Sequence, residues 1–579
     1  MALSATSDDW REKVDATVLE AASVREIAYI VLLNEQADLS EATELRTKLE
    51  KGKYVFERLS ELAERTQPDI IETLISENVE YQRFWIANMI LVKSGLQILE
   101  KVARSPAVSA IHANSQLRID QSAIDPQLPK SQSSPEGIEW NITLVQAPAV
   151  WGQGITGQGV IVGGIDTGYE WQHSALIHQY RGSDGEQVDH NYNWHDAVHI
   201  KASRCQPDSP EPCDESTVGH GTLTMGIMVG DDGQGNRIGM APDAKWIGCR
   251  CWEPENGTYI SYITECLEWM VAPTDLNGDN SDPSKAPHVI TNSYLCTAEE
   301  GCEALDALEI SFNNVRAAGI VVLGGAGNDG PVCSSINLPP AIYKDYFSVG
   351  ATTSNDSIAR LSSRGPVMID GSDRIKPDVV APGQDIRSST IDDSYLEVRG
   401  TSFAGPHVAG LVALLLSANP ALAGNVDLIE EIIIHTAVPI TTSQVCGDTE
   451  GTYFPNNTYG YGRIDALAAY ELAISASEEV GTTSQNVPGF FTTHNHPNPF
   501  NEMTTIKYFM PTPTEVVMKI YDIRGEQIRT IDQGLVKTGL KVIRWDGKDD
   551  QGQPMPSGIY FYQIRAGELR QTQKMILLK

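Results

Sequence analysis

The feature that most constrains this fold is an alternation of short apolar runs with helix-length segments between residues 159 and 323. The first run, Gly159–Ile165, is continuous and contains β-branched residues, which is typical of a strand buried on both faces. Further buried-strand runs follow at Trp246–Cys251, His288–Leu295 and Gly319–Leu323. Helical patterns separate the runs at Gly221–Val229, Tyr259–Val271 and Ala304–Ala318. This order predicts an α/β fold in three layers, with a parallel sheet between helices and functional groups at the carboxyl ends of the strands.

The flanking sequence has a different pattern on each side of this region. On the N-terminal side, strand and helix patterns alternate and predict a small α+β domain with helices on one face of its sheet: Arg25–Leu33, Leu45–Ile75, Tyr81–Val92 and Leu96–Ala103. From residue 494, short alternating strands separated by turn signals predict an all-β sandwich. We therefore expect an N-terminal domain (1–123), a polar linker (124–137), the α/β domain (138–475), a second linker (476–493) and the sandwich (494–579).

Composition narrows the partners and the location. The net charge of -33 argues against nucleic acid or an anionic membrane as a partner, because phosphate contact needs a basic surface. We expect no transmembrane segment, and the first ten residues lack the basic start and apolar region of a secretory signal. Nine cysteines nevertheless favour an oxidising compartment, so we expect a secreted or cell-surface protein.

The cysteines all lie between Cys205 and Cys446. Cys205 with Cys213, and Cys296 with Cys302, bracket short loops and are candidates for local disulfide bonds. The odd number leaves at least one thiol unpaired. A zinc site is the alternative use of these residues, but the sequence has no Cys-x-x-Cys pair, so we expect no metal site here.

A serine at the start of a helical pattern is the first candidate for chemistry. Ser402 lies in Gly400–Gly410, directly before the apolar run Leu411–Leu416. The free N–H groups and the positive end of a helix dipole lie at such a start, where they favour negative charge on a nearby oxygen. Ser402 is therefore a candidate nucleophile, provided a base activates it. The alternative interpretation is a capping serine in a tightly packed helix start.

The rest of the α/β region supplies groups that a nucleophilic serine needs. Acyl transfer requires a base for the hydroxyl proton and a carboxylate that orients the base. His220 follows a glycine at another predicted helix start, and Asp166 ends the first buried strand. Asn328 lies in the glycine-rich stretch Gly324–Gly330, where its amide can donate to an oxyanion. The order Asp166, His220, Ser402 is the order found in subtilisin.

Residues 138–475 resemble the subtilisin family of serine proteases. The segments that carry the resemblance are Asp166-Thr167-Gly168, His220-Gly221-Thr222 and Gly400–His407, in family order. Glu139-Trp140-Asn141-Ile142 and Trp171–Leu176 are similar to the bacillopeptidase F branch. The resemblance implies that Asp166, His220 and Ser402 form a catalytic triad, that Asn328 is the oxyanion donor, and that polypeptides are the substrates.

The resemblance also implies a substrate cleft and the partners of the flanking domains. A peptide would add as a strand beside Ser293, Tyr294 and Leu295 and beside Gly324, Gly325 and Ala326. Leu295 replaces a glycine usual in the family, and its volume predicts a narrow P1 pocket that prefers small side chains. The chemistry needs no cofactor. A structural calcium ion is compatible with the family, but Asp275–Asn280 lacks the glycine and glutamate of a calcium loop, so a solvated loop is favoured there.

Residues 1–123 resemble the family's propeptide, chiefly at Arg83–Asn88, which implies an inhibitor and folding chaperone removed by self-cleavage in the linker. A stable N-terminal domain that is never removed is the alternative. The C-terminal segment His496–Asn501 is similar to type IX secretion sorting domains, and Trp545–Asp550 is similar to the Ig-like domain of the flagellar hook-capping protein. The sequence thus predicts a secreted, self-processing serine endopeptidase that contacts its own propeptide and secretion machinery. The competing hypothesis is a surface-displayed binding or adhesion protein on an inactive protease scaffold.

Overall fold

The computed structural model describes residues 10–117, 137–200, 203–253, 257–293, 306–447, 451–452, 454–478, 491–492, 495, 499–501, 503–510, 513–537, 539–567 and 569–578. It divides into two compact units. One comprises Met1–Val426 with Ala437–Leu467, and the other comprises Asp427–Thr436 with Ala468–Lys579.

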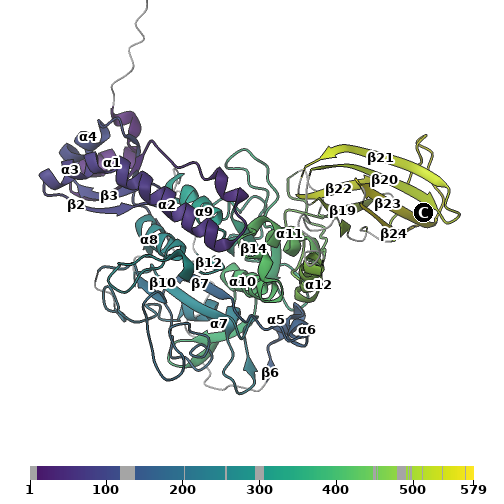
Figure 1. The fold of residues 1–579 in the computed structure, drawn as a ribbon, viewed down its shortest axis with the longest axis horizontal. Helices are drawn as coiled ribbons and strands as arrows, with labels where there is room; N and C mark the ends of the chain where they lie inside the picture. Colours follow the sequence, from purple (N-terminus) through teal and green to yellow (C-terminus); the bar gives the residue numbers. More distant parts are fainter. Residues whose placement is uncertain are drawn as a thin grey trace, which may run out of the picture. The chain divides into compact units, whose positions relative to one another are not determined.

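The first unit is built around a seven-stranded sheet, shown with its helices in Figure 1. In spatial order its strands are β15 (Val379–Pro382), β14 (Phe347–Thr352), β13 (Val321–Gly325), β12 (Val289–Asn292), β7 (Ile161–Asp166), β10 (Lys245–Arg250) and β8 (Trp194–Asp196). Every neighbouring pair is parallel. The predicted α/β fold is therefore confirmed, because continuous apolar runs of four to six residues can be buried only when both faces of a sheet are covered.

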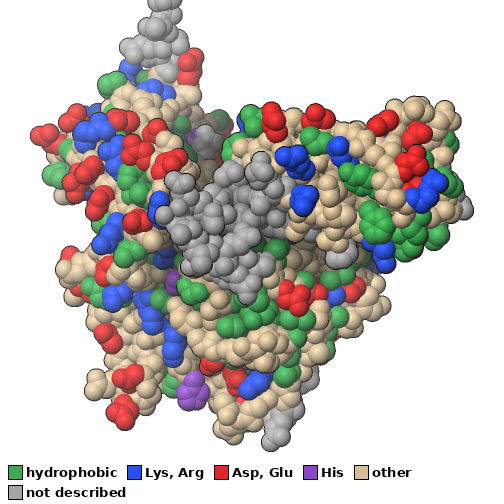
Figure 2. Space-filling view, turned by 45° about the vertical axis from the view of Figure 1, so that its right-hand side comes forward, with side chains coloured by type: hydrophobic (Ala, Val, Ile, Leu, Met, Phe, Trp, Pro, Cys, Tyr) green, Lys and Arg blue, Asp and Glu red, His purple; other side chains and the backbone are tan. Residues whose placement is uncertain are grey.

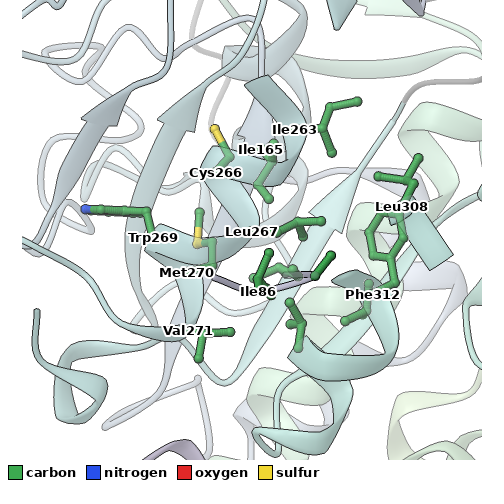
Figure 3. Packing of buried hydrophobic residues seen from close by; sticks show 14 of the residues in the cluster. Ile86, Ile165, Ile263, Cys266, Leu267, Trp269, Met270, Val271, Leu308 and Phe312 are labelled. Atoms are coloured by element: carbon green, nitrogen blue, oxygen red, sulfur yellow. The ribbon is translucent and has the colours of Figure 1, made fainter. Parts of the chain in front are cut away.

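Helices cover both faces of this sheet. On one face α8 (Ile260–Val271) packs beside α9 (Asp306–Ala317). On the other face α7 (His220–Val229) packs beside α10 (Thr401–Ala418). Figure 3 shows Leu267 and Met270 of α8, Phe312 of α9 and Ile165 of β7 pointing into one apolar cluster. Within the described part of the chain, helix α10 alone has the length and apolar composition of a membrane span, and 89% of it is buried inside the fold.

The N-terminal part of this unit has its own antiparallel sheet in the order β2-β3-β1-β4. Its elements are η1 (Trp10–Lys13), α1 (Ala16–Ala22), β1 (Ile27–Leu33), η2 (Ser40–Glu44), α2 (Lys48–Thr66), α3 (Pro68–Ser76), β2 (Glu80–Phe84), β3 (Met89–Ser94), α4 (Leu96–Ala103) and β4 (Val108–Ala113). The sequence pattern predicted one strand over Tyr81–Val92, whereas the structure has a hairpin there. Its turn ends at Asn88, whose φ of 44° is left-handed, a conformation that asparagine tolerates.

The two faces of this small sheet enter different cores. Tyr29 and Val31 of β1 pack with α1, α3 and α4, while Ile30 and Leu32 belong to the cluster that contains α8 and α9. Helix α2 joins this second cluster through Val55. The prediction of helices on one face only was therefore wrong, because strand alternation gives β1 a second apolar face that α2 and the α/β domain cover.

Short elements complete the first unit: β5 (Gln116–Leu117), β6 (Gly137–Ile138), α5 (Trp140–Leu144), α6 (Ala147–Trp151), β9 (Asn236–Arg237), β11 (Thr258–Tyr259), η4 (Pro283–Lys285), β16 (Ile386–Thr390), β17 (Ser394–Val398) and η6 (Pro420–Leu422). On the face shown in Figure 2, acidic and basic side chains are interspersed. Among the described residues, three disulfide bonds join Cys205 to Cys213, Cys249 to Cys266 and Cys333 to Cys446. The first was a sequence candidate; the other candidate, Cys296 with Cys302, lies outside the described residues, and Cys251 is a buried free thiol.

The second unit contains α11 (Val426–Thr436), α12 (Ala466–Glu478) and two antiparallel sheets. One sheet has the order β18-β19-β22 and the other β21-β20-β23-β24, with bounds β18 (Phe491–Thr492), β19 (Thr504–Met510), β20 (Thr514–Asp522), β21 (Gln527–Val536), β22 (Gly539–Trp545), β23 (Gly558–Ala566) and β24 (Leu569–Leu577). Side chains from both sheets, among them Trp545 and Tyr562, form its core. Most described side chains of β21 are at least partly exposed, so this strand has little apolar alternation.

Candidate active site

Asp166 is the last residue of β7, at the carboxyl end of the parallel sheet. It is 4% exposed, and its Oδ1 accepts a hydrogen bond from the backbone N–H of Thr167 at 2.7 Å. Gly168 follows with φ of 110°, and a Cβ there would overlap the carbonyl oxygen of Cys213. The Asp166-Thr167-Gly168 motif therefore ends a buried strand in a turn whose third position has room only for glycine.

His220 begins α7, directly after Gly219 in a left-handed conformation. Its Nδ1–H donates to Oδ1 of Asp166 over 2.7 Å. Burial alone lowers the pKa of His220, but the charge and hydrogen bond of Asp166 outweigh it, so the pKa is raised from its ordinary value. Nε2 of His220 is buried and has no hydrogen-bond partner among the described residues. The pair is thus arranged as a carboxylate-oriented imidazole whose second nitrogen is available to take a proton.

Ser402 is the second residue of α10 and is partly exposed. The ring of the adjacent Phe403 lies 5.5 Å from the imidazole of His220, so the start of α10 and the start of α7 meet beside the Asp166–His220 pair. Pro406 lies inside the helix, where its missing N–H cannot bond the carbonyl of Ser402. His407 donates from Nδ1 to the carbonyl of Phe403, and burial lowers its pKa to about 4, so it is a neutral structural residue.

Asn328 lies after the carboxyl end of β13, half-buried and beside the start of α10. Its Oδ1 accepts from both the N–H and the hydroxyl of Thr401, at 2.9 and 3.1 Å. The hydroxyl oxygen of Thr401 in turn accepts the N–H of Gly327 at 3.2 Å. Because both bonds use the amide oxygen, the two N–H donors of Asn328 remain for another acceptor.

The residues expected to bind substrate are only partly described. Ser293 follows β12 and is buried, whereas Tyr294 and Leu295 lie outside the described residues. Gly324 and Gly325 end β13, and Ala326 is buried. A Cβ on Gly325 would lie 2.6 Å from Oγ1 of Thr401. The close approach of α10 is therefore enough to require glycine at this position.

The structure adds two features that motif reasoning did not find. Thr258 and Tyr259, the strand β11, pair antiparallel with Gln116 and Leu117 of the N-terminal part, so this part of the chain covers an edge of β11. Two-residue strands have too little pattern to be detected. The second feature is Asp214, a buried carboxylate whose oxygens bind the segments of Asp166 and His220. The only sequence signal for it was its place after a disulfide cysteine.

The residues that the structure describes contain no group of three or more His, Cys, Asp or Glu side chains able to hold a metal ion. In the loop considered for calcium, Oδ1 of Asp275 accepts the N–H groups of Asn277 and Asp279, and its Oδ2 accepts from the side chain of Asn280. These hydrogen bonds close the loop into a turn around Asp275.

Comparison with known proteins assigns both units. The model of the Subtilase family matches residues 157–462, more than half of the chain, and the model of the FlgD Ig-like domain matches residues 502–568. Bacillopeptidase F of Bacillus subtilis (strain 168) is 35% identical over 441 residues, which cover 73% of this chain and 29% of that protein.

Two shorter relatives are matched over nearly their whole length. Alkaline protease of Alkalihalobacillus alcalophilus is 26% identical over 74% of this chain and 93% of its own length. Subtilisin BL of Lederbergia lenta is 29% identical over 58% of this chain and 99% of its own length. The chain therefore belongs to the subtilase family of serine endopeptidases, and its C-terminal part contains an FlgD Ig-like domain.

Proposed function

We propose that the chain is a secreted endopeptidase that cleaves polypeptides through an acyl-enzyme and is made as a self-processing zymogen. The observation that carries the catalytic assignment is the 2.7 Å hydrogen bond between Asp166, at the end of β7, and His220, at the start of α7. The start of α10, which carries Ser402, lies beside this pair. Ser402 is the nucleophile, His220 the base, Asp166 the orienting carboxylate and Asn328 the oxyanion donor.

In the proposed reaction, Oγ of Ser402 attacks the scissile carbonyl while Nε2 of His220 takes its proton. A side-chain N–H of Asn328 and the positive end of the α10 dipole stabilise the oxyanion. His220 then donates the proton to the leaving amine, and an acyl-Ser402 ester remains. Water, activated by His220 in the same way, releases the acid. These steps require no metal or cofactor.

A fluorophosphonate probe tests this assignment directly, because it forms a covalent bond only with an activated serine. We expect the mature wild-type enzyme to be labelled and to hydrolyse casein, and Ser402→Ala to do neither. A wild-type protein that has lost its N-terminal domain and still resists labelling would favour the rival function, a binding or adhesion protein on an inactive scaffold.

The contacts of the N-terminal domain support its proposed role as an inhibitor. Its last described strand, β5, pairs with the edge strand β11, in the way that an extended peptide adds to a sheet edge. A chain segment on this edge would exclude a substrate peptide from it. Beyond the undescribed residues 118–136, the chain continues as β6, which pairs with β9.

Helix α8 of the α/β domain supplies a second set of contacts. A carboxylate oxygen of Glu268 accepts the backbone N–H groups of Trp85 and Ile86, in the turn of the β2–β3 hairpin. Glu265 accepts from the side chain of Gln82 at 2.6 Å, and Asn314 of α9 donates to the carbonyl of Ile86. Ile86 itself enters the apolar cluster with Leu267 and Phe312 (Figure 3). The hairpin is thus held by both polar and apolar groups, as an inhibitor or chaperone of this surface needs.

Maturation is tested by following the purified full-length precursor over time. We expect wild-type protein to be cut between residues 118 and 136 and Ser402→Ala to remain intact, with the site read by N-terminal sequencing. Equal processing of both proteins would exclude self-cleavage. A fully active wild-type enzyme that is never cut would show that the N-terminal domain is permanent.

Two finer proposals concern specificity and export. The volume of Leu295 supports a preference for small P1 side chains, and best turnover of large aromatic P1 residues in a peptide library would contradict it.

The resemblance of His496–Asn501 to type IX sorting domains supports export by that machinery. Fusing residues 494–579 to a periplasmic reporter in a host with that system would test this proposal. If the reporter were not delivered to the cell surface, the C-terminal part would be an appended Ig-like module without a sorting role.

A further inference from the structure

We propose that Asp214 is a positioning residue of the active site, and that the disulfide-closed loop Cys205–Cys213 holds it in place. This inference rests on the proposed triad of Asp166, His220 and Ser402. Asp214 does not contact the reacting atoms; it acts by fixing the two segments that carry Asp166 and His220 relative to one another.

The four hydrogen bonds of Asp214 connect the two segments. Its Oδ1 accepts from the hydroxyl of Thr167 at 2.8 Å and from the N–H of Ser216 at 3.0 Å. Its Oδ2 accepts from the N–H of Thr222 at 3.0 Å and from the hydroxyl of Thr222 at 2.6 Å. Thr167 follows Asp166, and Thr222 lies two residues after His220. One side chain therefore spans the end of β7 and the first turn of α7.

Thr167 completes the connection from the other direction. While its hydroxyl donates to Asp214, the same oxygen accepts the N–H of Gly221 at 2.9 Å. The N–H groups of Gly221 and Thr222 are two of the orphan donors at the start of α7, and a carboxylate at this end of a helix is electrostatically favourable. Asp214 thus caps the helix that begins with His220, using Thr167 as a bridge.

The loop that carries Asp214 is fixed on both sides of it. Cys213, the preceding residue, is bonded to Cys205, and its carbonyl packs against Gly168 so closely that a Cβ on Gly168 would overlap it. On the other side, the N–H of Glu215 donates to the carbonyl of Thr167 at 2.9 Å. These contacts leave the backbone of residues 213–215 little freedom beside the Asp166-Thr167-Gly168 turn.

Glu215 extends the brace into the loop itself. Its carboxylate accepts the backbone N–H groups of Ser203, Arg204 and Cys205 and is paired with the buried Arg250. Arg250 is the neighbour of Asp166 in the β7–β10 register. Glu215 thus resembles Asp214 in burial and in sequence position, but its contacts go to the loop and to Arg250, whereas those of Asp214 go to the residues beside the triad.

The charge of Asp214 also reaches His220. It contributes to raising the pKa of His220, together with Asp166, and its charge also contributes to raising the pKa of the buried Tyr169. Burial raises the pKa of Asp214 to about 6, and the bonds from Thr222 and Thr167 oppose this rise. Replacement by a neutral isostere should therefore have an electrostatic signature in His220 that a purely structural role would not produce.

The test compares Asp214→Asn with Glu215→Gln, the adjacent buried carboxylate. For Asp214→Asn we expect kcat to fall about 10- to 100-fold with a smaller change in KM, because the geometry of His220 and Ser402 is disturbed. The acid limb of the kcat/KM profile should move to lower pH, because His220 loses a neighbouring negative charge. Glu215→Gln should leave the acid limb at the wild-type pH. Wild-type kcat and an unmoved limb in Asp214→Asn, or the same shift in both variants, would overturn the proposal.

Two further measurements keep the outcome decisive. Cys205→Ser with Cys213→Ser retains the charge but removes the tether, so kcat should fall while the acid limb stays; wild-type kcat would refute the role of the disulfide. If Asp214→Asn does not fold, this double variant decides.

Separately, the imidazole of His220 can be titrated by NMR of histidine-labelled Ser402→Ala protein, with and without Asp214→Asn. A lowered His220 pKa supports the coupling and an unchanged one contradicts it, even if the wild-type enzyme proves inactive and the proposed function fails.

Discussion

At the scale of single residues, the imidazole of His220 is governed by carboxylates on separate segments. Asp166 binds it directly, while Asp214 lies within electrostatic range and binds its helix. Both carboxylates favour the protonated form of this imidazole, which is the form that would arise in the proposed attack by Ser402. Their net effect outweighs the burial of His220, which by itself disfavours the charged ring.

Asp166→Asn should lower kcat about 10⁴-fold, because an amide cannot hold the imidazole in the tautomer that accepts a proton at Nε2. The residual activity should show an acid limb at lower pH, since the pKa of His220 loses the contribution that raises it. Steady-state kinetics against a chromogenic peptide between about pH 5 and 10 measure both effects, with Ser402→Ala as the background. Less than a tenfold loss of kcat would contradict the assigned role.

The residues proposed for catalysis stand out in the sequence because each belongs to a local motif with a structural cause. A glycine with positive φ lies within two residues of each of them, Gly168 near Asp166, Gly219 before His220 and Gly400 near Ser402. Asp214 and Thr258 could not be predicted in this way, because their roles depend on contacts with segments 47 and 141 residues away in sequence, Thr167 and Leu117. Such pairings are set by tertiary packing rather than by local pattern.

At the scale of elements, α8 contacts the N-terminal hairpin through a partly buried acid. Burial raises the pKa of Glu268 from 4.5 to about 8, opposed by the hydrogen bonds from Ile86 and Trp85 and by Arg83, and reinforced by Glu265. The docked state therefore retains a proton that a solvated glutamate loses. Docking is strongest below about pH 4.5 and weakens as the pH rises through the window from 4.5 to 8.

Glu268→Gln should remove this pH dependence while keeping the contact, because the amide oxygen can still accept both N–H groups. Hydrogen exchange of the Trp85 and Ile86 amides in intact Ser402→Ala protein, corrected for intrinsic rates, reports the opening of the hairpin. We expect opening to increase from about pH 5 to 7 with Glu268 and to stay constant with glutamine. The range stops at pH 7 because burial lowers the pKa of Lys48 of α2 to about 7. Above that pH, the contribution of Lys48 to docking becomes more favourable as the pH rises, which opposes the effect of Glu268.

Predicting elements from sequence succeeded or failed according to burial. Strands β7, β10, β12 and β13 were located because both faces are buried, which leaves a continuous apolar run. The β2–β3 hairpin was merged into one strand, because its turn at residues 85–88 is itself apolar and packs into the core. Strand β21, with exposed side chains, had no comparable pattern.

At the scale of the whole molecule, disulfide bonds close loops of very different length within the first unit. Cys333–Cys446 spans 113 residues of sequence, whereas Cys205–Cys213 spans 8. By chain entropy the longer loop should contribute roughly 5 kcal/mol to the free energy of unfolding and the shorter roughly 2.5 kcal/mol. The two bonds therefore have different tasks, one stabilising the fold and the other positioning Asp214.

Replacing Cys333 and Cys446 by serine should lower the Tm more than replacing Cys205 and Cys213. The comparison belongs in the Ser402→Ala background, where self-digestion does not obscure unfolding, with calorimetry as the measurement. In active protein the order should reverse for kcat, since only the short loop adjoins the triad. A larger Tm loss from the short loop would mean that native contacts, not loop closure, set the stability.

The C-terminal Ig-like unit should be dispensable for catalysis. Its two sheets bury a core of their own, and all four proposed catalytic residues lie between 166 and 402. A chain ending at residue 478 should retain kcat/KM on a small peptide within about twofold, measured after confirming equal active-site concentration with a fluorophosphonate. A large loss in the truncated chain, with an unchanged Tm, would show that the unit takes part in catalysis.

The free thiol of Cys251 has a consequence for how the protein is made. Cys249 lies in β10 and Cys251 directly follows that strand; both are buried in the same apolar cluster, but only Cys249 is bonded to Cys266. A two-residue slip of β10 would keep every side chain on its face, yet it would offer the wrong sulfur and move Arg250 away from Asp166. Oxidative folding must therefore seat β10 against β7 before Cys266 reacts, or else reshuffle a mispaired isomer. Oxidative refolding without a disulfide isomerase should therefore leave part of the protein in a covalently trapped form with a misplaced β10.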